Sequence, residues 1–156
     1  MATPTSIRVL GAGDIEALRG MLEVFGSAFE DPQTYCTNQP NDGYLGQLLS
    51  NPNFLALAAF SGSEVIGGLA GYFLPKFEQA RTEFYIYDLA VAEKHRRRGV
   101  ATALIEGLKT QARQCGVHVI FVQADYGDES AVALYTKLGV REDVMHFDIA
   151  PSESAA

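Results

Sequence analysis

The residues whose types and spacing most clearly indicate chemistry form the basic run Lys94-His95-Arg96-Arg97-Arg98-Gly99-Val100-Ala101. Four of the twelve lysines and arginines fall within five positions of a chain whose net charge is −7. A helical apolar period follows, so the run directly precedes the expected start of a helix. A helix N-terminus presents unpaired N–H groups and the positive end of a dipole, and Gly99 and Ala101 leave room for an anion to reach them. The run therefore predicts a site for a pyrophosphate or a sugar phosphate, with a solvated basic turn as the alternative.

Other phosphate chemistry and metal chemistry lack support in the sequence. Neither GxxxxGK[ST] nor a strand followed by GxGxxG occurs, which argues against a nucleoside triphosphate or dinucleotide loop. Cys36 and Cys115 stand far apart, and the three histidines have no metal-ligand spacing, so we expect neither a disulfide nor a metal site. The negative net charge disfavours a nucleic-acid partner and suits either a cationic ligand or solubility alone.

The elements that must position the basic run follow from hydrophobic periodicity. We expect strands at residues 7–10, 54–60, 65–73, 83–91, 117–124 and 144–149, and helices at residues 14–29, 44–49, 99–115 and 128–138. Asp14 is expected to cap the first helix, and the continuous apolar strand 117–124 is expected to be central and buried on both faces. This order predicts an α+β fold with a mixed sheet and a late βαβ crossover.

Length and composition fit a single domain over residues 1–156, with a frayed tail at 151–156. No apolar run is long enough to span a bilayer, and no leader pattern opens the chain, so we expect a cytoplasmic protein without membrane contact.

Two signatures, in order and at normal spacing, carry a resemblance to a known superfamily. Arg96-x-x-Gly99-x-Ala101 resembles the [QR]-x-x-G-x-[GA] signature of GNAT acetyltransferases, in which this loop holds the pyrophosphate of coenzyme A. Leu134-Tyr135-Thr136-Lys137-Leu138-Gly139-Val140 resembles their second signature, L-Y-x-K-x-G-F. The resemblance implies the GNAT fold, with a mixed central sheet of six to seven strands flanked by about four helices. Residues 74–79, 85–91, 122–128 and 144–149 are, in addition, similar to the class I gentamicin 3-N-acetyltransferases.

The resemblance also implies acetyl-CoA as cosubstrate and direct attack by the acceptor amine, without a protein nucleophile. Tyr135 is the candidate general acid, because a phenol with a pKa near ~10 stays protonated at neutral pH, and packing on the sheet is its alternative role. Asp128 stands where the superfamily often has Asn, and Tyr126-Gly127 looks like an insertion. The implied cofactor contacts are Leu89, Ala90, Val91, Arg96, Arg97, Arg98, Gly99, Val100, Ala101, Thr102, Asp128, Ala131 and Tyr135.

The base that deprotonates the amine stays open among several carboxylates. Glu83, Tyr85 and Tyr87 alternate onto one face of strand 83–91, where related families carry a catalytic His or Glu. Candidate bases are Glu83, Asp88, Asp143 and Asp148, acting directly or through water, with His146 as a further candidate that could equally be structural. The two tyrosines either line the substrate site or belong to the core.

A polycationic acceptor calls for several carboxylates around a groove, although some of these acids could be solvated loop residues. The substrate-binding candidates are Glu30, Asp31, Tyr85, Tyr87, Asp125, Tyr126, Asp143 and Asp148. Together these features predict a homodimeric enzyme that acetylates the 3-amino group of gentamicin-type aminoglycosides and confers resistance to them. The alternatives are a GNAT enzyme for a polyamine or a protein lysine, and a coenzyme A sensor without transfer activity.

Overall fold

The computed structural model describes residues 3–153, in which the chain forms two compact units that divide between Gln123 and Ala124. The first unit contains β1 (Thr5–Val9), α1 (Ile15–Ala28), a π-helical turn (Gln33–Thr37), α2 (Asp42–Ser50), β2 (Phe54–Ser61), β3 (Glu64–Pro75), β4 (Thr82–Val91), a 3₁₀ turn (Glu93–His95), α3 (Val100–Gln114) and β5 (Val117–Val122). The second unit contains α4 (Glu129–Leu138). No helix within residues 3–153 is long and apolar enough to cross a bilayer.

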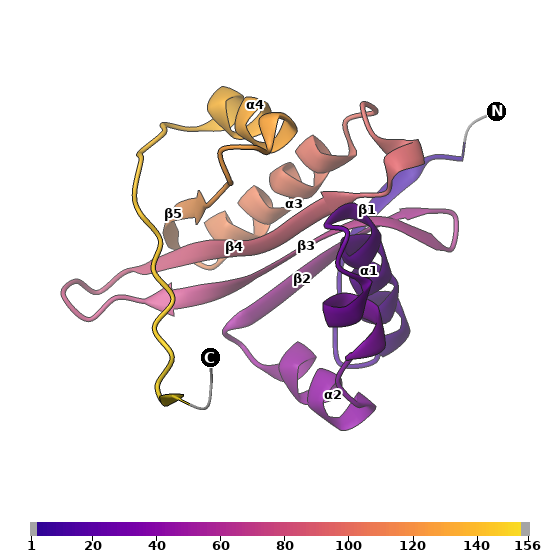
Figure 1. Ribbon diagram of the computed structural model, residues 1–156, viewed down its shortest axis with the longest axis horizontal. Helices are drawn as coiled ribbons and strands as arrows, with labels where there is room; N and C mark the ends of the chain where they lie inside the picture. The colour runs from indigo at the N-terminus through magenta and orange to yellow at the C-terminus, as the bar shows by residue number, and fades with distance from the viewer. Residues whose placement is uncertain (1–2, 154–156) are drawn as a thin grey trace. The chain divides into compact units, whose positions relative to one another are not determined.

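The strands form one mixed sheet in the order β1-β2-β3-β4-β5, antiparallel except for the parallel pair β4–β5 (Figure 1). The α+β fold, the mixed sheet and the βαβ crossover through α3 are therefore confirmed. The GNAT expectation of six to seven strands exceeds the five strands that the described residues form.

Helices cover both faces of this sheet (Figure 1). On one face, Leu18, Met21 and Phe25 of α1 pack with Leu45 of α2 against alternate residues of β2. Spacings of three and four place the three α1 side chains on one side of the helix. The opposite face of β2 presents Leu57 to α3. The five buried residues of α3 follow the same helical period: Val100, Leu104, Ile105, Leu108 and Ala112.

Three expectations from the sequence were wrong. The strand expected at 144–149 is absent, because an alternating apolar pattern forms a strand only where another segment pairs with its backbone. The strand expected to be central, β5, ends the sheet order, and Val119 is 43% exposed. Asp14 does occupy the N-cap position of α1, but its carboxylate accepts hydrogen bonds from the Gly11 N–H and from Arg8 instead of capping the helix.

Candidate active site

The turn between β4 and α3 leaves the N-terminus of α3 open. Gly99 is the N-cap of α3 and has φ of +77°, and Arg97 also has a positive φ of +62°. A Cβ atom added at Gly99 would meet no protein atom within 4 Å. Glycine supplies no side-chain acceptor for the first N–H groups of the helix, at Val100, Ala101 and Thr102. These N–H groups are therefore available to an anion, as the signature predicts.

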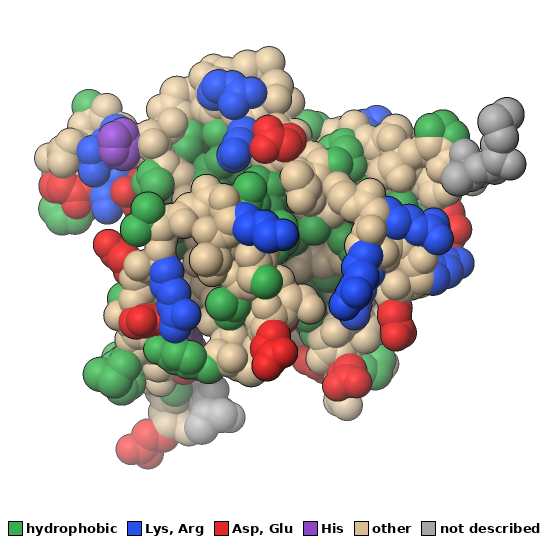
Figure 2. All heavy atoms as spheres, turned by 90° about the horizontal axis from the view of Figure 1, so that it is seen from above, with side chains coloured by type: hydrophobic (Ala, Val, Ile, Leu, Met, Phe, Trp, Pro, Cys, Tyr) green, Lys and Arg blue, Asp and Glu red, His purple; other side chains and the backbone are tan. Residues whose placement is uncertain are grey.

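The basic side chains of this turn divide into two groups. Arg96 donates a hydrogen bond of 3.2 Å from Nε to the carbonyl of Val91, and Lys94 lies 3.5 Å from a carboxylate oxygen of Glu64. Arg97 and Arg98 are exposed and form no ion pair with any residue of the described range. Figure 2 shows basic side chains on the right of this face, the side on which Figure 1 shows the turn between β4 and α3, and others spread over the rest of the face. Arg97 and Arg98 are therefore the two arginines left to neutralise a phosphate.

A cavity of about 490 Å³ lies between the outer side of α1 and the start of β3, and Arg96 also lines it. Four glutamates and two serines are among its other lining residues: Glu16, Glu23, Glu64, Glu93, Ser27 and Ser63. Its acidic lining does not suit a phosphate, because like charges in contact repel, which leaves the N-terminus of α3 as the candidate anion site.

In the second half of β4, before the turn, β4 and β5 no longer pair. Their parallel pairing runs from Thr82 to Ile86 and ends where Ile86 faces Val122. Residues 88–91 stay paired with β3 on their other side, where Leu89 faces Leu69 and Val91 faces Gly67. Among the described strands, the edge of residues 87–91 that turns toward β5 has no partner. An unpaired strand edge offers backbone N–H and C=O groups to an extended ligand.

A β-bulge in β4 determines which side chains stand beside this open edge. Ala70 of β3 pairs with Asp88 and Gly71 pairs with Ile86, so Tyr87 is the extra residue. Strict alternation would place Tyr87 and Asp88 on opposite faces of the sheet. Instead, Tyr87 contacts Tyr72, whose partner Phe54 belongs to the core cluster of α1, and Asp88 accepts a hydrogen bond of 3.1 Å from Tyr35, which packs on the same helix. The bulge thus brings Tyr87 and Asp88 to the face that α1 covers.

Asp88 has the properties of a base that works near neutral pH. Burial raises its pKa to about 6, although the hydrogen bond from Tyr35 opposes this rise. A carboxylate with such a pKa is mostly ionised at pH 7 and still has appreciable proton affinity. Among the candidate bases, Asp88 is the one for which the geometry and the pKa agree.

Five aromatic rings from four strands extend this face, and we call them the aromatic wall: Phe54, Tyr72, Tyr85, Tyr87 and Phe121. Tyr72 contacts Phe54 and Tyr87 at ring-centroid distances of 5.4 and 6.0 Å, and Tyr85 stacks on Phe121 at 4.8 Å. Burial raises the pKa of both Tyr72 and Tyr85. Tyr87 is 61% exposed, which makes it a surface residue of this face and excludes it from the core.

The other candidates in the first unit are distributed over both ends of the sheet. Glu83 lies five residues before Asp88, or ~17 Å along an extended strand, in the part of β4 that is paired with β5. Its carboxylate is 3.8 Å from Lys76 Nζ. Glu30 and Asp31 lie after α1, where the Asp31 carboxylate accepts a hydrogen bond from the Thr34 N–H and its carbonyl accepts one from the Tyr35 N–H at 3.3 Å. The structure therefore groups Asp31 with Asp88 and leaves Glu83 apart.

Candidates in the second unit make contacts of their own. Asp128 caps α4 by accepting a hydrogen bond from the Ala131 N–H at 3.2 Å, as expected for its position. Asp143 accepts hydrogen bonds from Arg141 Nε at 2.9 Å and from the Tyr126 hydroxyl at 3.3 Å. The remaining two acidic candidates are Asp148, which lies 2.8 Å from His146, and Asp125. Asp143 and Asp148 thus already have partners that would compete with a cationic substrate.

Sequence reasoning missed Tyr35 and Tyr72. Both lie beside Asp88 on the α1 side of the sheet, and the polar, Pro-bearing sequence around Tyr35 predicts only a loop between the helices expected at 14–29 and 44–49. An aromatic residue inside such a loop was the available signal. Within residues 3–153, no group of three or more His, Cys, Asp or Glu residues could hold a metal ion.

Comparison with known proteins identifies the class to which this fold and site belong. A model of the acetyltransferase (GNAT) family matches residues 18–140. The chain is a member of the GNAT acetyltransferase family.

Two solved structures resemble this chain over nearly its whole length. An aminoglycoside acetyltransferase, HMB0005, from an uncultured soil metagenomic sample is 52% identical, with a TM-score of 0.94 and coverage of 96% of this chain and 99% of that one. A second aminoglycoside acetyltransferase of soil metagenomic origin, meta-AAC0020, is 28% identical, with a TM-score of 0.87 and coverage of 95% and 97%. Its structures include complexes with trehalose and with sisomicin.

Among curated relatives, an N-alpha-acetyltransferase from Sulfurisphaera tokodaii is 28% identical over an alignment of 96 residues that covers 54% of this chain. The match spans 58% of the length of that relative.

Proposed function

We propose that this protein transfers the acetyl group of acetyl-CoA to the 3-amino group of gentamicin-type aminoglycosides and thereby confers resistance to them. The observation that carries the proposal is the likeness to an aminoglycoside acetyltransferase at 52% identity over 99% of that chain. The open edge of β4, the accessible N-terminus of α3 and the half-buried carboxylate of Asp88 supply the parts that such a transfer needs.

The donor side of the reaction is assigned to backbone groups and the turn. GNAT enzymes use acetyl-CoA, whose pyrophosphate would accept hydrogen bonds from the N–H groups of Val100, Ala101 and Thr102 and be neutralised by Arg97 and Arg98. The pantetheine arm would pair with residues 89–91 as an added strand does. An N–H group of this edge would polarise the acetyl carbonyl and stabilise the oxyanion.

On the acceptor side, Asp88 serves as the base. The protonated amine gives one proton to Asp88, and its nitrogen then attacks the acetyl carbonyl carbon. The C–S bond breaks, and the leaving thiolate takes a proton from a general acid. The second proton that the nitrogen loses restores this acid. Tyr135, on α4 of the second unit, is proposed as this acid on the strength of its signature alone. Neutral aromatic faces at Tyr85 and Tyr87, with the carboxylates of Glu30, Asp31 and Asp125, suit a polycation.

The substrate class is tested by competition among amines. We expect thiol release from acetyl-CoA to be fastest with gentamicin and slow with spermidine, a lysine peptide and a peptide with a free amino terminus. The last peptide is included because curated relatives are N-alpha-acetyltransferases. Faster turnover of either peptide or of spermidine would replace the proposed acceptor, and no release with any amine would favour a coenzyme A sensor. The homodimer and the cytoplasmic location stay predictions.

A further inference from the structure

Tyr35 connects the segment between α1 and α2 to the candidate base. Its hydroxyl donates a hydrogen bond of 3.1 Å to Oδ2 of Asp88, which lies 53 positions later in the chain. The ring of Tyr35 packs at centroid distances of 6.0 Å from Phe25 and 5.5 Å from Phe29. The hydroxyl therefore reaches Asp88 from a side chain that two rings of the α1 region hold.

The segment after α1 packs closely against that helix at Gly26. A Cβ atom at Gly26 would lie 2.7 Å from Cys36 Sγ and 3.3 Å from Tyr35 Cβ, closer than side chains pack. The Asp31 N–H also donates to the Gly26 carbonyl at 2.9 Å. Glycine at position 26 therefore permits the approach that brings Tyr35 within reach of β4.

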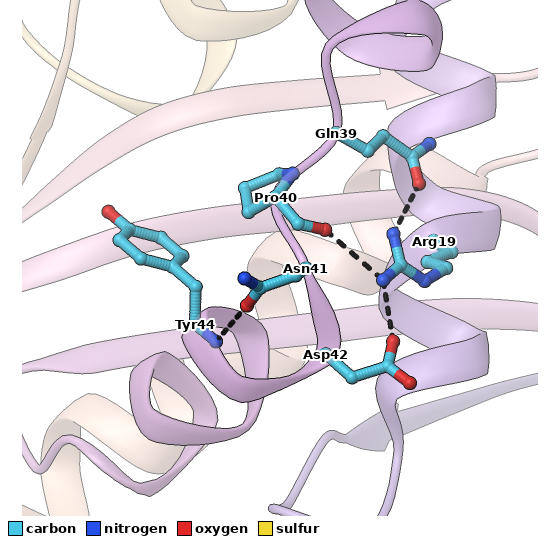
Figure 3. A network of polar contacts seen from close by, with 6 residues as sticks. All are labelled: Arg19, Gln39, Pro40, Asn41, Asp42 and Tyr44. Carbon is cyan, nitrogen blue, oxygen red and sulfur yellow. Dashed lines mark hydrogen bonds and ion pairs between the residues drawn. The ribbon is translucent and has the colours of Figure 1, made fainter.

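A hydrogen-bond network holds the backbone of Tyr35 as well. Gln39 donates from Nε2 to the Tyr35 carbonyl at 2.9 Å, and its Oε1 accepts from Arg19 Nη1 at 2.8 Å. Arg19 also donates to the Pro40 carbonyl at 3.1 Å and to Asp42 at 2.6 Å (Figure 3). The guanidinium of Arg19 on α1 thus binds three consecutive parts of the chain, from Gln39 to the first residue of α2.

No cation offsets the burial of Asp88 within the described chain. None of the ion pairs of residues 3–153 includes Asp88. The titratable groups around the pair of Asp88 and Tyr35 are one carboxylate and three phenols, contributed by the segment after α1, by β3 and by β4. Asp31 and Tyr87 act on Tyr35, and Asp88 itself acts on Tyr72 and Tyr85. A donated hydrogen bond is the favourable contact that the ionised carboxylate has here.

We propose that Tyr35 is a positioning residue for the reaction: its hydroxyl orients the Asp88 carboxylate toward the acceptor amine and keeps it ionised, and Gln39 and Arg19 hold Tyr35 in place. The inference rests on the proposed function, because it assigns Asp88 the role of base. It places part of the control of catalysis in the π-helical turn between α1 and α2.

The test compares Tyr35→Phe with Tyr44→Phe, which removes a phenol hydroxyl from the exposed side of α2. The pKa of Asp88 is measured in the free protein from the ¹³C signals of aspartate carboxyl groups, assigned with Asp88→Asn. Loss of the hydrogen bond and of a polar neighbour both disfavour the ionised carboxylate, so the pKa of Asp88 should rise in Tyr35→Phe alone. In kcat/KM for gentamicin, we expect a loss of about threefold to tenfold at pH 6 that shrinks toward pH 8.

A further variant, Gln39→Leu, keeps the Tyr35 hydroxyl and removes its support, and it should shift the pH profile in the same direction by less. If Tyr35→Phe folds with an unchanged titration of Asp88 and an unchanged pH profile, the proposal is wrong. A loss of kcat/KM that is equal at all pH values, with the Asp88 titration unmoved, would also overturn it and leave Tyr35 a packing residue. If the wild type acetylates no aminoglycoside, the proposed function fails, yet the titration of Asp88 still decides whether Tyr35 controls it.

Discussion

Ile86 faces Val122 across the last rung of the parallel ladder between β4 and β5. Beyond that rung β4 continues for five residues, through the bulge at Tyr87 and past Asp88 to Val91, bound to β3 alone. The basic turn and the glycine-capped helix α3 follow at once. One short stretch of chain therefore carries an open backbone edge, a half-buried carboxylate and the helix start proposed as the anion site, in that order.

The anion site is tested by Gly99→Val, with Gly116→Val as a matched control. Both glycines have positive φ, +77° and +70°, and a Cβ atom at either would meet no protein atom within 4 Å. The backbone strain, of order 1–2 kcal/mol, should be alike in the two variants. Only Gly99 borders the N-terminus of α3, so its variant should bind acetyl-CoA at least about tenfold more weakly by calorimetry. Equal affinities in the two folded variants would contradict the phosphate site.

Asp88→Asn tests the base through activity. Because the carboxylate must be ionised to accept a proton, wild-type kcat/KM should climb as pH rises through about 6, the pKa of Asp88. The variant should lose about a hundredfold to ten-thousandfold in kcat/KM and lose that limb of the profile. A variant with near wild-type turnover would return the role of base to Glu83, Asp143, Asp148 or His146.

Asp88→Asn, which should lower activity, should in contrast raise the stability of the folded protein. The folded-state pKa of Asp88 is raised, so its contribution to stability is complete below its unfolded value of 3.8 and is lost as pH rises through about 6. Asp88→Asn avoids this loss and can still accept the Tyr35 hydrogen bond. Its melting temperature should therefore exceed that of the wild type at pH 7, by a margin that shrinks toward pH 4. A margin independent of pH would show that burial does not penalise the carboxylate.

Tyr135→Phe tests the general acid. The phenol proton is needed only when the thiolate leaves, so kcat should fall by about tenfold to a thousandfold while the affinity for acetyl-CoA changes little. Steady-state kinetics and calorimetry on the same preparation separate the two effects. An unchanged kcat would assign Tyr135 a structural role on α4.

Charge neutralisation tests which acids face a polycationic substrate. Asp143 is already paired with Arg141, so Asp125→Asn should raise KM for gentamicin more than Asp143→Asn does. Added salt should raise the same constant in the wild type, because charges beyond a Debye length of about 8–10 Å are screened. KM for acetyl-CoA should respond less. If KM for gentamicin changes neither with salt nor with either substitution, these acids are solvated and do not bind the substrate.

Local signals predicted much of this molecule. The apolar period of α3, its glycine cap and the Asp128 cap of α4 are each encoded within a few neighbouring residues, and the structure has them where they were expected. The residue at which a strand stops pairing, by contrast, is not determined by its neighbours in the sequence. The last rung at Ile86 and the bulge at Tyr87 depend on two partner strands, β5 and β3.

The same distinction explains what was missed in the site. Tyr35 and Asp88 are 53 positions apart and meet only because α1 packs on the sheet and Gly26 allows the next segment to lie close to it. Alternation along β4 predicted the face of Tyr85 and Tyr87 but could not show that a bulge turns Asp88 toward the same side.

The most direct test of the central claim is the product itself. The protein, acetyl-CoA and gentamicin are incubated together, the antibiotic is examined by mass spectrometry, and NMR locates any new acetyl group, with Asp88→Asn as the matched control. We predict a gain of one acetyl group, on the 3-amino nitrogen, and far slower gain with the variant. Gentamicin of unchanged mass in the presence of active, acetyl-CoA-binding protein would contradict the assignment of an aminoglycoside as the substrate, and an acetyl group at another nitrogen would contradict the 3-position.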